Sequence, residues 1–183
     1  MHTKVLWITR TAILLALLIV LQAVTTRLGA TFPPPWNSIL TGSIVNMMLV
    51  VSVMTCGYAS GAVIAAISPV MPTLLGFGPT WLLVPFIAAG NLTLVTIWHF
   101  IGNRKTGGKY TPYIIAALVA AAAKFAVLYS GIILLALPII LKLPKNSPLS
   151  TMFSYPQLIT ATIGGFVAIL IFPTLRKAIQ KDG

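Results

Sequence analysis

The sequence predicts an all-α integral membrane protein, a bundle of six transmembrane helices with both chain ends in the cytoplasm. Apolar side chains make up 58% of the 183 residues, charged side chains make up only 7%, and the mean hydropathy is +1.00. A soluble domain carries roughly 25% charged residues, because its surface must be hydrated. The apolar residues also fall into six runs, and most cations lie in the breaks between runs or at the chain ends.

The apolar runs cover residues 5–27, 41–58, 60–76, 80–101, 111–141 and 155–175. Six spans of about 20 to 23 residues use roughly 130 residues and leave about 50 for loops, so we expect one membrane domain over residues 1–183. Lys4 and Arg10 precede the apolar stretch of the first segment, as basic residues do in a signal peptide. However, Arg27 lies just before Ala30, the plausible cleavage point, which favours a retained helix.

Residues that end helices mark the breaks between the runs. Three consecutive prolines at 33–35 follow the first run, and a polar loop at 103–109 precedes the fifth. The third run contains Pro69 and Pro72, which interrupt helical hydrogen bonds, and broken backbone at membrane depth occurs only where it is buried or lines a cavity. The fifth run exceeds the length of one span, and we expect Pro138 to mark its end.

The positions of the cations predict the orientation of the bundle. If the N-terminus is inside, eight Lys and Arg residues lie in inner segments and three lie in outer segments. Cytoplasmic loops of membrane proteins carry an excess of Lys and Arg, so the count favours this orientation. Trp7 and Trp98 fall at the expected inner boundaries, and Trp36 and Trp81 fall at the outer ones. Tryptophan is typical of both membrane interfaces, so the aromatic residues support the same arrangement.

The charge balance excludes several classes of function. Twelve Lys and Arg residues face a single acid, Asp182, so no carboxylate pair exists for hydrolysis and no acid lies in the spans as a proton or sodium relay. Cys56 and two histidines are too few for a metal site. Residues 107–109, Gly-Gly-Lys, lack the rest of a phosphate-binding loop. We therefore expect no enzyme activity, no cofactor, no metal and no nucleic-acid partner.

Lys124 is the strongest candidate for a functional residue. A lysine near mid-membrane costs at least about 2.5–3.5 kcal/mol, so it should face the protein interior and have a partner. Lys124 lies roughly 18 Å from the inner end of its expected helix, and Asn91 lies about 15 Å from the outer end of its own. In a hydrocarbon core of about 30 Å these depths nearly coincide, so an Asn91–Lys124 hydrogen bond is possible. Lys124 either joins helices through such bonds or meets an acceptor on a ligand.

Further polar and aromatic side chains gather in the outer half of the expected bundle. These candidate ligand-binding residues, with Asn91 and Lys124, are Gln22, Trp36, Asn46, Trp81, Tyr129, Tyr155 and Gln157. A ligand pocket combines apolar walls with a few polar groups. Anchoring at the interface explains the aromatic residues equally well. The amides within spans need partners in either case.

Ala12 and Ala16 lie one helical turn apart in the first span. Small side chains at this spacing let helix backbones approach closely. The pair fits packing within the bundle or contact with another membrane protein.

Five short motifs follow one another along the chain, in addition to the six short spans and the Ala12-x-x-x-Ala16 pair. The motifs are Gly42-Ser43-Ile44-Val45-Asn46, Ile67-Ser68-Pro69, Val84-Pro85-Phe86 with Gly90-Asn91, Tyr155-Pro156-Gln157, and Ile163-Gly164-Gly165. In these features and their order the chain resembles the substrate-binding S components of energy-coupling factor (ECF) vitamin transporters.

This resemblance implies capture of a water-soluble vitamin at the outer face of a bacterial cell membrane, for ATP-driven uptake by a transmembrane T component and two ATPase subunits. It also implies that Ala12 and Ala16 face the T component. Cobalamin is the first candidate ligand, followed by pantothenate or folate. A cation such as thiamine is disfavoured, because the spans contain no acid.

The alternatives are a freestanding secondary transporter or channel, which would be expected to show internal repeats or a coupling-ion site, and a non-transport membrane scaffold. For the ligand site we expect walls from the fourth, fifth and sixth helices and a lid from loops around Trp36, Phe77 and Tyr155.

Overall fold

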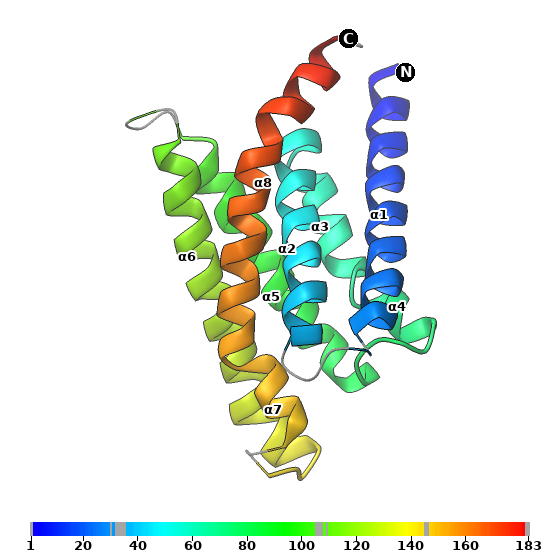
Figure 1. The fold of residues 1–183 in the computed structure, drawn as a ribbon, viewed down its shortest axis with the longest axis vertical. Coiled ribbons are helices and arrows are strands. Elements are labelled where there is room, and N and C mark those ends of the chain that lie inside the picture. Colours follow the sequence, from blue (N-terminus) through cyan, green and yellow to red (C-terminus); the bar gives the residue numbers. More distant parts are fainter. Residues whose placement is uncertain are drawn as a thin grey trace.

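The computed structural model of the chain describes residues 2–29, 31, 36–104, 108, 110–144 and 147–181, and within these residues it contains helices and no strands (Figure 1). The α-helices are α1 (His2–Gly29), α2 (Trp36–Cys56), α3 (Tyr58–Ile67), α4 (Val70–Leu74), α5 (Val84–Ile97), α6 (Thr111–Leu128), α7 (Pro148–Phe153) and α8 (Tyr155–Lys181). A 3₁₀ turn, η1 (Trp81–Leu83), precedes α5, and π-helical segments η2 (Trp98–Gly102) and η3 (Tyr129–Ile140) continue α5 and α6.

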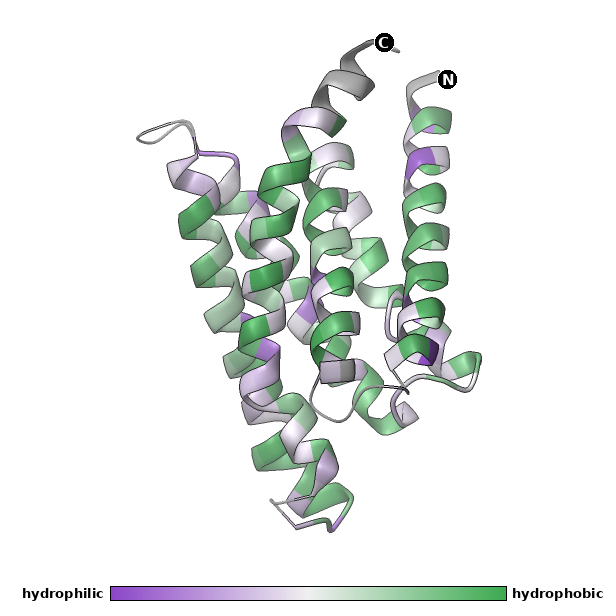
Figure 2. Ribbon diagram, in the orientation of Figure 1, coloured by the Kyte–Doolittle hydropathy of each residue, from purple (hydrophilic) through white to green (hydrophobic). Residues whose placement is uncertain are grey.

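The helices form the predicted membrane bundle. Five helical stretches of the described chain are long and apolar enough to cross a membrane, and Tyr58–Leu74 is a shorter apolar helical pair. Hydrophobic residues dominate along these helices in Figure 2. Figure 1 shows α1 and α6 at opposite sides with α2 and α8 between them, and both chain ends at the same end of the bundle. An even number of crossings places the two ends on one side of a membrane.

The third segment is divided as its prolines predict. Helix α3 ends at Ile67. The helix is broken at Ser68 and Pro69, and the short helix α4 then adds about one turn that contains Pro72. The start of the second helix differs from the expectation, because α2 begins at Trp36 rather than near residue 41. Its first turn is polar, and polar residues at the end of a span are compatible with a helix that reaches the interface.

The fifth helix continues beyond the point at which the sequence predicted its end. Pro138 lies inside η3, which runs on to Ile140. The π-helical register accommodates this, because the N–H of Leu141 donates to the carbonyl of Ala136, five residues earlier. The 30 residues of Thr111–Ile140 extend at most about 45 Å, and their 18 α-helical residues alone extend about 27 Å, so the whole stretch exceeds a hydrocarbon core of about 30 Å.

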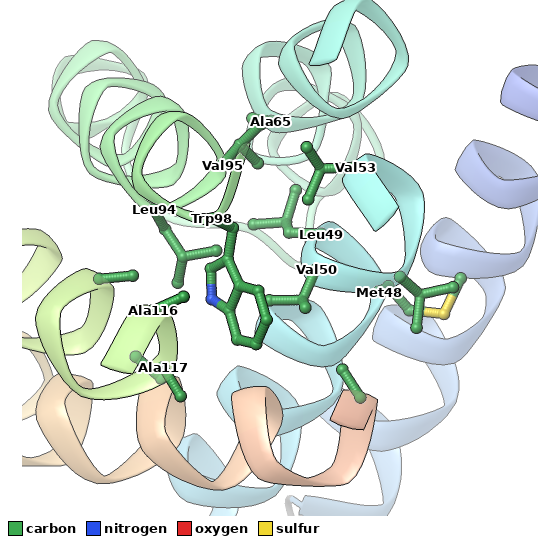
Figure 3. Packing of buried hydrophobic residues seen from close by; sticks show 14 of the residues in the cluster. Met48, Leu49, Val50, Val53, Ala65, Leu94, Val95, Trp98, Ala116 and Ala117 are labelled. Atoms are coloured by element: carbon green, nitrogen blue, oxygen red, sulfur yellow. The ribbon is translucent and has the colours of Figure 1, made fainter. Parts of the chain in front are cut away.

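Trp98 lies in the core rather than at the membrane boundary, so its assignment as an interfacial anchor was wrong. Its side chain is 2% exposed and packs among buried residues of α2, α5 and α6, as Figure 3 shows. Small residues make this space. A β-carbon added to Gly102 or Gly165 would lie 3.3 Å from the indole ring, and Ala116 and Ala117 are fully or almost fully buried.

Helix α2 packs most extensively against α8, and glycines allow the two backbones to approach. A β-carbon on Gly164 would lie 2.6 Å from the carbonyl oxygen of Ser43 and 2.7 Å from the amide nitrogen of Met47. On the other helix, a β-carbon on Gly42 would lie 2.9 Å from a methyl carbon of Thr160. The helices therefore meet at a separation that no larger residue at position 164 permits.

We expect Gly164→Ala to destabilise the protein by about 1–3 kcal/mol, because the added methyl group meets backbone atoms that cannot rotate away. Thermal unfolding of the purified protein in detergent measures the effect. Gly165→Ala is the matched control, since its β-carbon approaches only side-chain atoms and Ala117 at 3.2 Å or more. An equal or larger loss in Gly165→Ala would contradict this account of the α2–α8 contact.

Candidate functional site

A cavity of about 450 Å³ lies in the half of the bundle farther from the two chain ends. It is lined by the last turns of α1, the first half of α2, the break between α3 and α4, the following loop, and parts of α5, α6, α7 and α8. The polar side chains in this lining are Gln22, Thr26, Ser38, Thr41, Asn46, Ser68, Thr80, Asn91, Lys124 and Gln157. The broken third segment thus lines a cavity, as broken backbone within a membrane must unless it is buried in protein.

The ammonium group of Lys124 is held by two amides from two other helices. Its Nζ donates to Oδ1 of Asn46 on α2 at 2.5 Å and to Oδ1 of Asn91 on α5 at 2.6 Å. All three side chains are almost completely buried, with exposed fractions of 3%, 1% and 2% for Lys124, Asn46 and Asn91. The predicted Asn91–Lys124 hydrogen bond is present, and Asn46 is a second partner.

Further hydrogen bonds fix the direction in which each amide points. Asn46 Nδ2 donates to the hydroxyl of Thr160 at 3.2 Å, and this hydroxyl donates to the carbonyl of Gln157. Asn91 Nδ2 donates to the hydroxyl of Ser68 at 2.9 Å, and Ser68 donates to the carbonyl of Ala65. Each amide nitrogen has an acceptor on the side away from Lys124, so both amide oxygens face the ammonium group.

The local sequence of α6 explains how a lysine enters the interior at this point. The alanines at 116, 117, 120 and 121 are all buried, and their small side chains let α6 pack closely against its neighbours. Lys124 continues this buried face about one turn later. Its long side chain carries the charged end to the polar groups of α2 and α5.

The loop after α4 brings an aromatic side chain to the cavity. The N–H groups of Phe77 and Gly78 both donate to the carbonyl of Pro72, at 3.0 and 2.9 Å. A β-carbon on Gly78 would lie 2.3 Å from the amide nitrogen of Thr73, so only glycine permits this approach. The tight loop places Phe77 and Pro79 in the cavity lining.

Apolar side chains form another part of the wall. Phe153 of α7 lines the cavity and belongs to a second buried cluster that includes Leu128, Ile132 and Leu137. Ile87 and Leu149, which pack against the same cluster, also line the cavity. The site therefore combines apolar walls with a few oriented polar groups, the composition typical of small-molecule sites.

Two buried polar atoms have no hydrogen-bond partner among the described residues, Oε1 of Gln22 and Oγ of Ser43. Gln22 lines the cavity from α1, whereas Ser43 does not line it. A buried acceptor without a partner costs about 1–3 kcal/mol. A donor group on a bound molecule would satisfy Gln22, which gives the cavity an acceptor in addition to the Lys124 donor.

The structure brings together five of the nine candidate ligand-binding residues. These are Gln22, Asn46, Asn91, Lys124 and Gln157, all in the cavity lining. The other four lie outside the lining and are substantially exposed: Trp36, Trp81, Tyr129 and Tyr155. Trp36, Trp81 and Tyr155 each lie at or near the start of a helical stretch, a position that suits anchoring at an interface, whereas Tyr129 lies within the Thr111–Ile140 stretch.

The walls of the cavity also differ from the expected ones. The fourth, fifth and sixth spans contribute, but α1, α2 and the short helix α7 contribute as well. Near Tyr155, the lining is provided by Met152 and Phe153 of α7. Part of the segment between the fifth and sixth apolar runs is therefore a short helix, whose first turn is capped by Ser147.

Ser68 and Thr160 are site residues that sequence reasoning missed. Both hydroxyls are buried and each holds one amide of the Lys124 network. Ser68 precedes a proline in a broken span, and Thr160 follows Gln157 by about one helical turn. Neither position alone indicates a hydroxyl that holds an amide of another helix, because that contact depends on which helices are neighbours.

Ala12 and Ala16 lie on the exposed side of α1, together with Ile13, Leu17 and Val20. Packing within this chain therefore does not account for the pair. No group of three or more His, Cys, Asp or Glu residues comes together in the described part of the chain.

A membrane-embedded helical bundle with a mixed apolar and polar cavity defines a class of membrane proteins that bind small molecules. A family model described as "ECF transporter, substrate-specific component" matches residues 7–176. The chain therefore belongs to the family of substrate-specific components of ECF transporters. It is a multi-pass membrane protein that binds substrate and associates with T and ATPase components. No match was found among curated proteins or solved structures.

We expect Asn91→Leu to lower stability by about 1–3 kcal/mol, because a buried ammonium group loses one of its two acceptors. Asn103→Leu is the matched control, since Asn103 is exposed at the end of η2. The double variant Asn91→Leu with Lys124→Met should lose less stability than the sum of the single variants, because the two residues share one interaction. Thermal unfolding in detergent tests both statements, and strictly additive losses would contradict the network.

Proposed function

We propose that this substrate-specific component captures a water-soluble vitamin in the cavity around Lys124. Capture takes place at the outer face of a bacterial cell membrane, and a T component with two ATPase subunits drives the uptake. The observation that carries the proposal is a cavity of about 450 Å³ whose apolar walls surround oriented polar groups. Its volume lies within the range of about 300–1,000 Å³ that is typical of small-molecule sites.

The sidedness of the proposal follows from the positions of the cavity and the chain ends. The cavity lies in the half of the bundle away from both ends. The excess of Lys and Arg in segments on the side of the chain ends favours a cytoplasmic location for that side. The cavity is then in the outer half of the membrane, where a subunit that captures vitamin from outside needs it.

The size of the cavity changes the order of the candidate vitamins. Cobalamin ranks first by sequence resemblance, but its corrin ring and nucleotide arm require a larger space than this cavity offers. Pantothenate and folate are smaller molecules with polar groups suited to amides and a lysine. We therefore place these two ahead of cobalamin. Thiamine is disfavoured, because Lys124 is positively charged and no acid lines the cavity.

Calorimetric titration of the purified protein with pantothenate, folate, cobalamin and thiamine tests this proposal. We expect one-to-one binding of pantothenate or folate and none of thiamine. Thr41→Trp fills the cavity lining and should reduce the affinity at least tenfold. Thr174→Trp, on the exposed side of α8, should leave it unchanged. Equal affinity in both variants would place the binding site elsewhere, and binding of thiamine alone would contradict the ligand assignment.

The exposed alanine pair on α1 supports a contact with the T component. We expect Ala12→Trp with Ala16→Trp to prevent co-purification of the T and ATPase subunits while vitamin binding by the isolated protein persists, because bulky side chains block close helix approach. Ala122 and Ala126 provide a matched control on α6, since they are also exposed and four residues apart. Loss of the complex in the α6 pair but not in the α1 pair would contradict the assignment.

A further inference from the structure

The positive charge of Lys124 has no counter-ion in the described chain. The sequence contains one acidic residue, Asp182, which lies outside the described residues. Lys124 is also the one charged side chain among the described residues that line the cavity. A charge buried in a protein interior is costly unless it is paired with an opposite charge or fully hydrogen-bonded.

The hydrogen bonds of Lys124 are incomplete. An ammonium group has three N–H donors, and two of them are directed at Oδ1 of Asn46 and Oδ1 of Asn91. No third acceptor for Nζ is found in the described part of the chain, and Lys124 lines the cavity. The group therefore has one donor left for a molecule in the cavity.

The two amides position the lysine but do not neutralise it. Each amide presents the negative end of its dipole, and the hydroxyls of Thr160 and Ser68 hold it in that orientation. The amides carry no net charge, so the site keeps a charge of +1, and the two hydrogen bonds hold the ammonium group in position. A carbonyl oxygen on a ligand would satisfy the remaining donor, but only an anion would also balance the charge.

We infer that the ligand of this cavity is an organic acid and that one carboxylate of this acid accepts the third N–H of Lys124. This inference rests on the proposed function and adds the chemical class of the ligand to it. A second polar group of the ligand, a hydroxyl or an amide N–H, donates to Oε1 of Gln22, which has no partner among the described residues. The apolar body of the ligand lies against Ile87, Phe77 and Phe153.

Pairs of acids and their neutral analogues test the charge of the ligand directly. We would titrate the purified protein with pantothenate and panthenol, biotin and biotinamide, and nicotinate and nicotinamide, together with folate and cobalamin. Members of a pair have nearly the same shape and differ in the anionic group. For the pair that binds, the acid should bind at least tenfold more tightly than its neutral analogue, as expected for a charge-assisted hydrogen bond. Folate as the only ligand would support the inference if its neutral diester bound at least tenfold more weakly.

Substitution of the lysine tests its role in that preference. In Lys124→Met the acid should lose at least tenfold in affinity, the neutral analogue should change little, and the preference should disappear. Lys142→Met is the matched control, because Lys142 is an exposed lysine outside the cavity lining. The preference should persist in this variant. If Lys124→Met does not fold, the comparison of acid and neutral analogue in the wild-type protein decides the question alone.

The outcomes separate the inference from the proposed function. Equal affinity for acid and neutral analogue, or binding of cobalamin alone, would overturn the inference and leave vitamin capture intact. A preference for the acid that survives Lys124→Met in a folded protein would overturn the role of the lysine. The absence of binding by every compound would overturn both the inference and the proposed function.

Discussion

One buried ammonium group organises the half of this molecule that contains the cavity. A lysine at mid-membrane costs at least about 2.5–3.5 kcal/mol, and this cost is reduced only when acceptors surround it. The acceptors come from α2 and α5, and the hydroxyls that hold them come from the break after α3 and from α8. Four separate parts of the chain thus converge on Lys124 of α6. The close contact at Gly164 belongs to the same arrangement, because it brings α8, and with it Thr160, to Asn46.

The sequence was sufficient to predict the helical membrane bundle and one hydrogen bond of the site. Hydropathy and helical rise give the depth of each residue along the membrane normal, which is why Lys124 and Asn91 were expected to meet. Depth does not reveal which helices are neighbours. Asn46 lies on α2, far from both in sequence, and its contact with Lys124 depends on the lateral arrangement of α2, α5 and α6. Ser68 and Thr160 were missed for the same reason.

The aromatic residues show the second limit of a prediction from depth. Trp98 and Trp36 both occupy positions near the end of an expected span, yet one is 2% exposed and the other 63% exposed. Their difference lies in their neighbours. Gly102 and Gly165 leave space for the indole of Trp98 within the bundle, whereas Trp36 begins α2 beside the outer surface. Rotation about the helix axis, set by packing, decides whether an aromatic side chain near the boundary faces the core or the membrane.

The helices of this bundle differ greatly in length, and the surrounding lipid must respond to the difference. Tyr58–Leu74, with 17 residues and a break at Ser68 and Pro69, extends at most about 25 Å, whereas Thr111–Ile140, with 30 residues, extends at most about 45 Å. A bilayer with a core of about 30 Å matches neither, so lipids thin beside the short segment, and the long helix tilts or thickens the bilayer around it. Hydrophobic mismatch of opposite sign within one small protein deforms the bilayer unevenly around it.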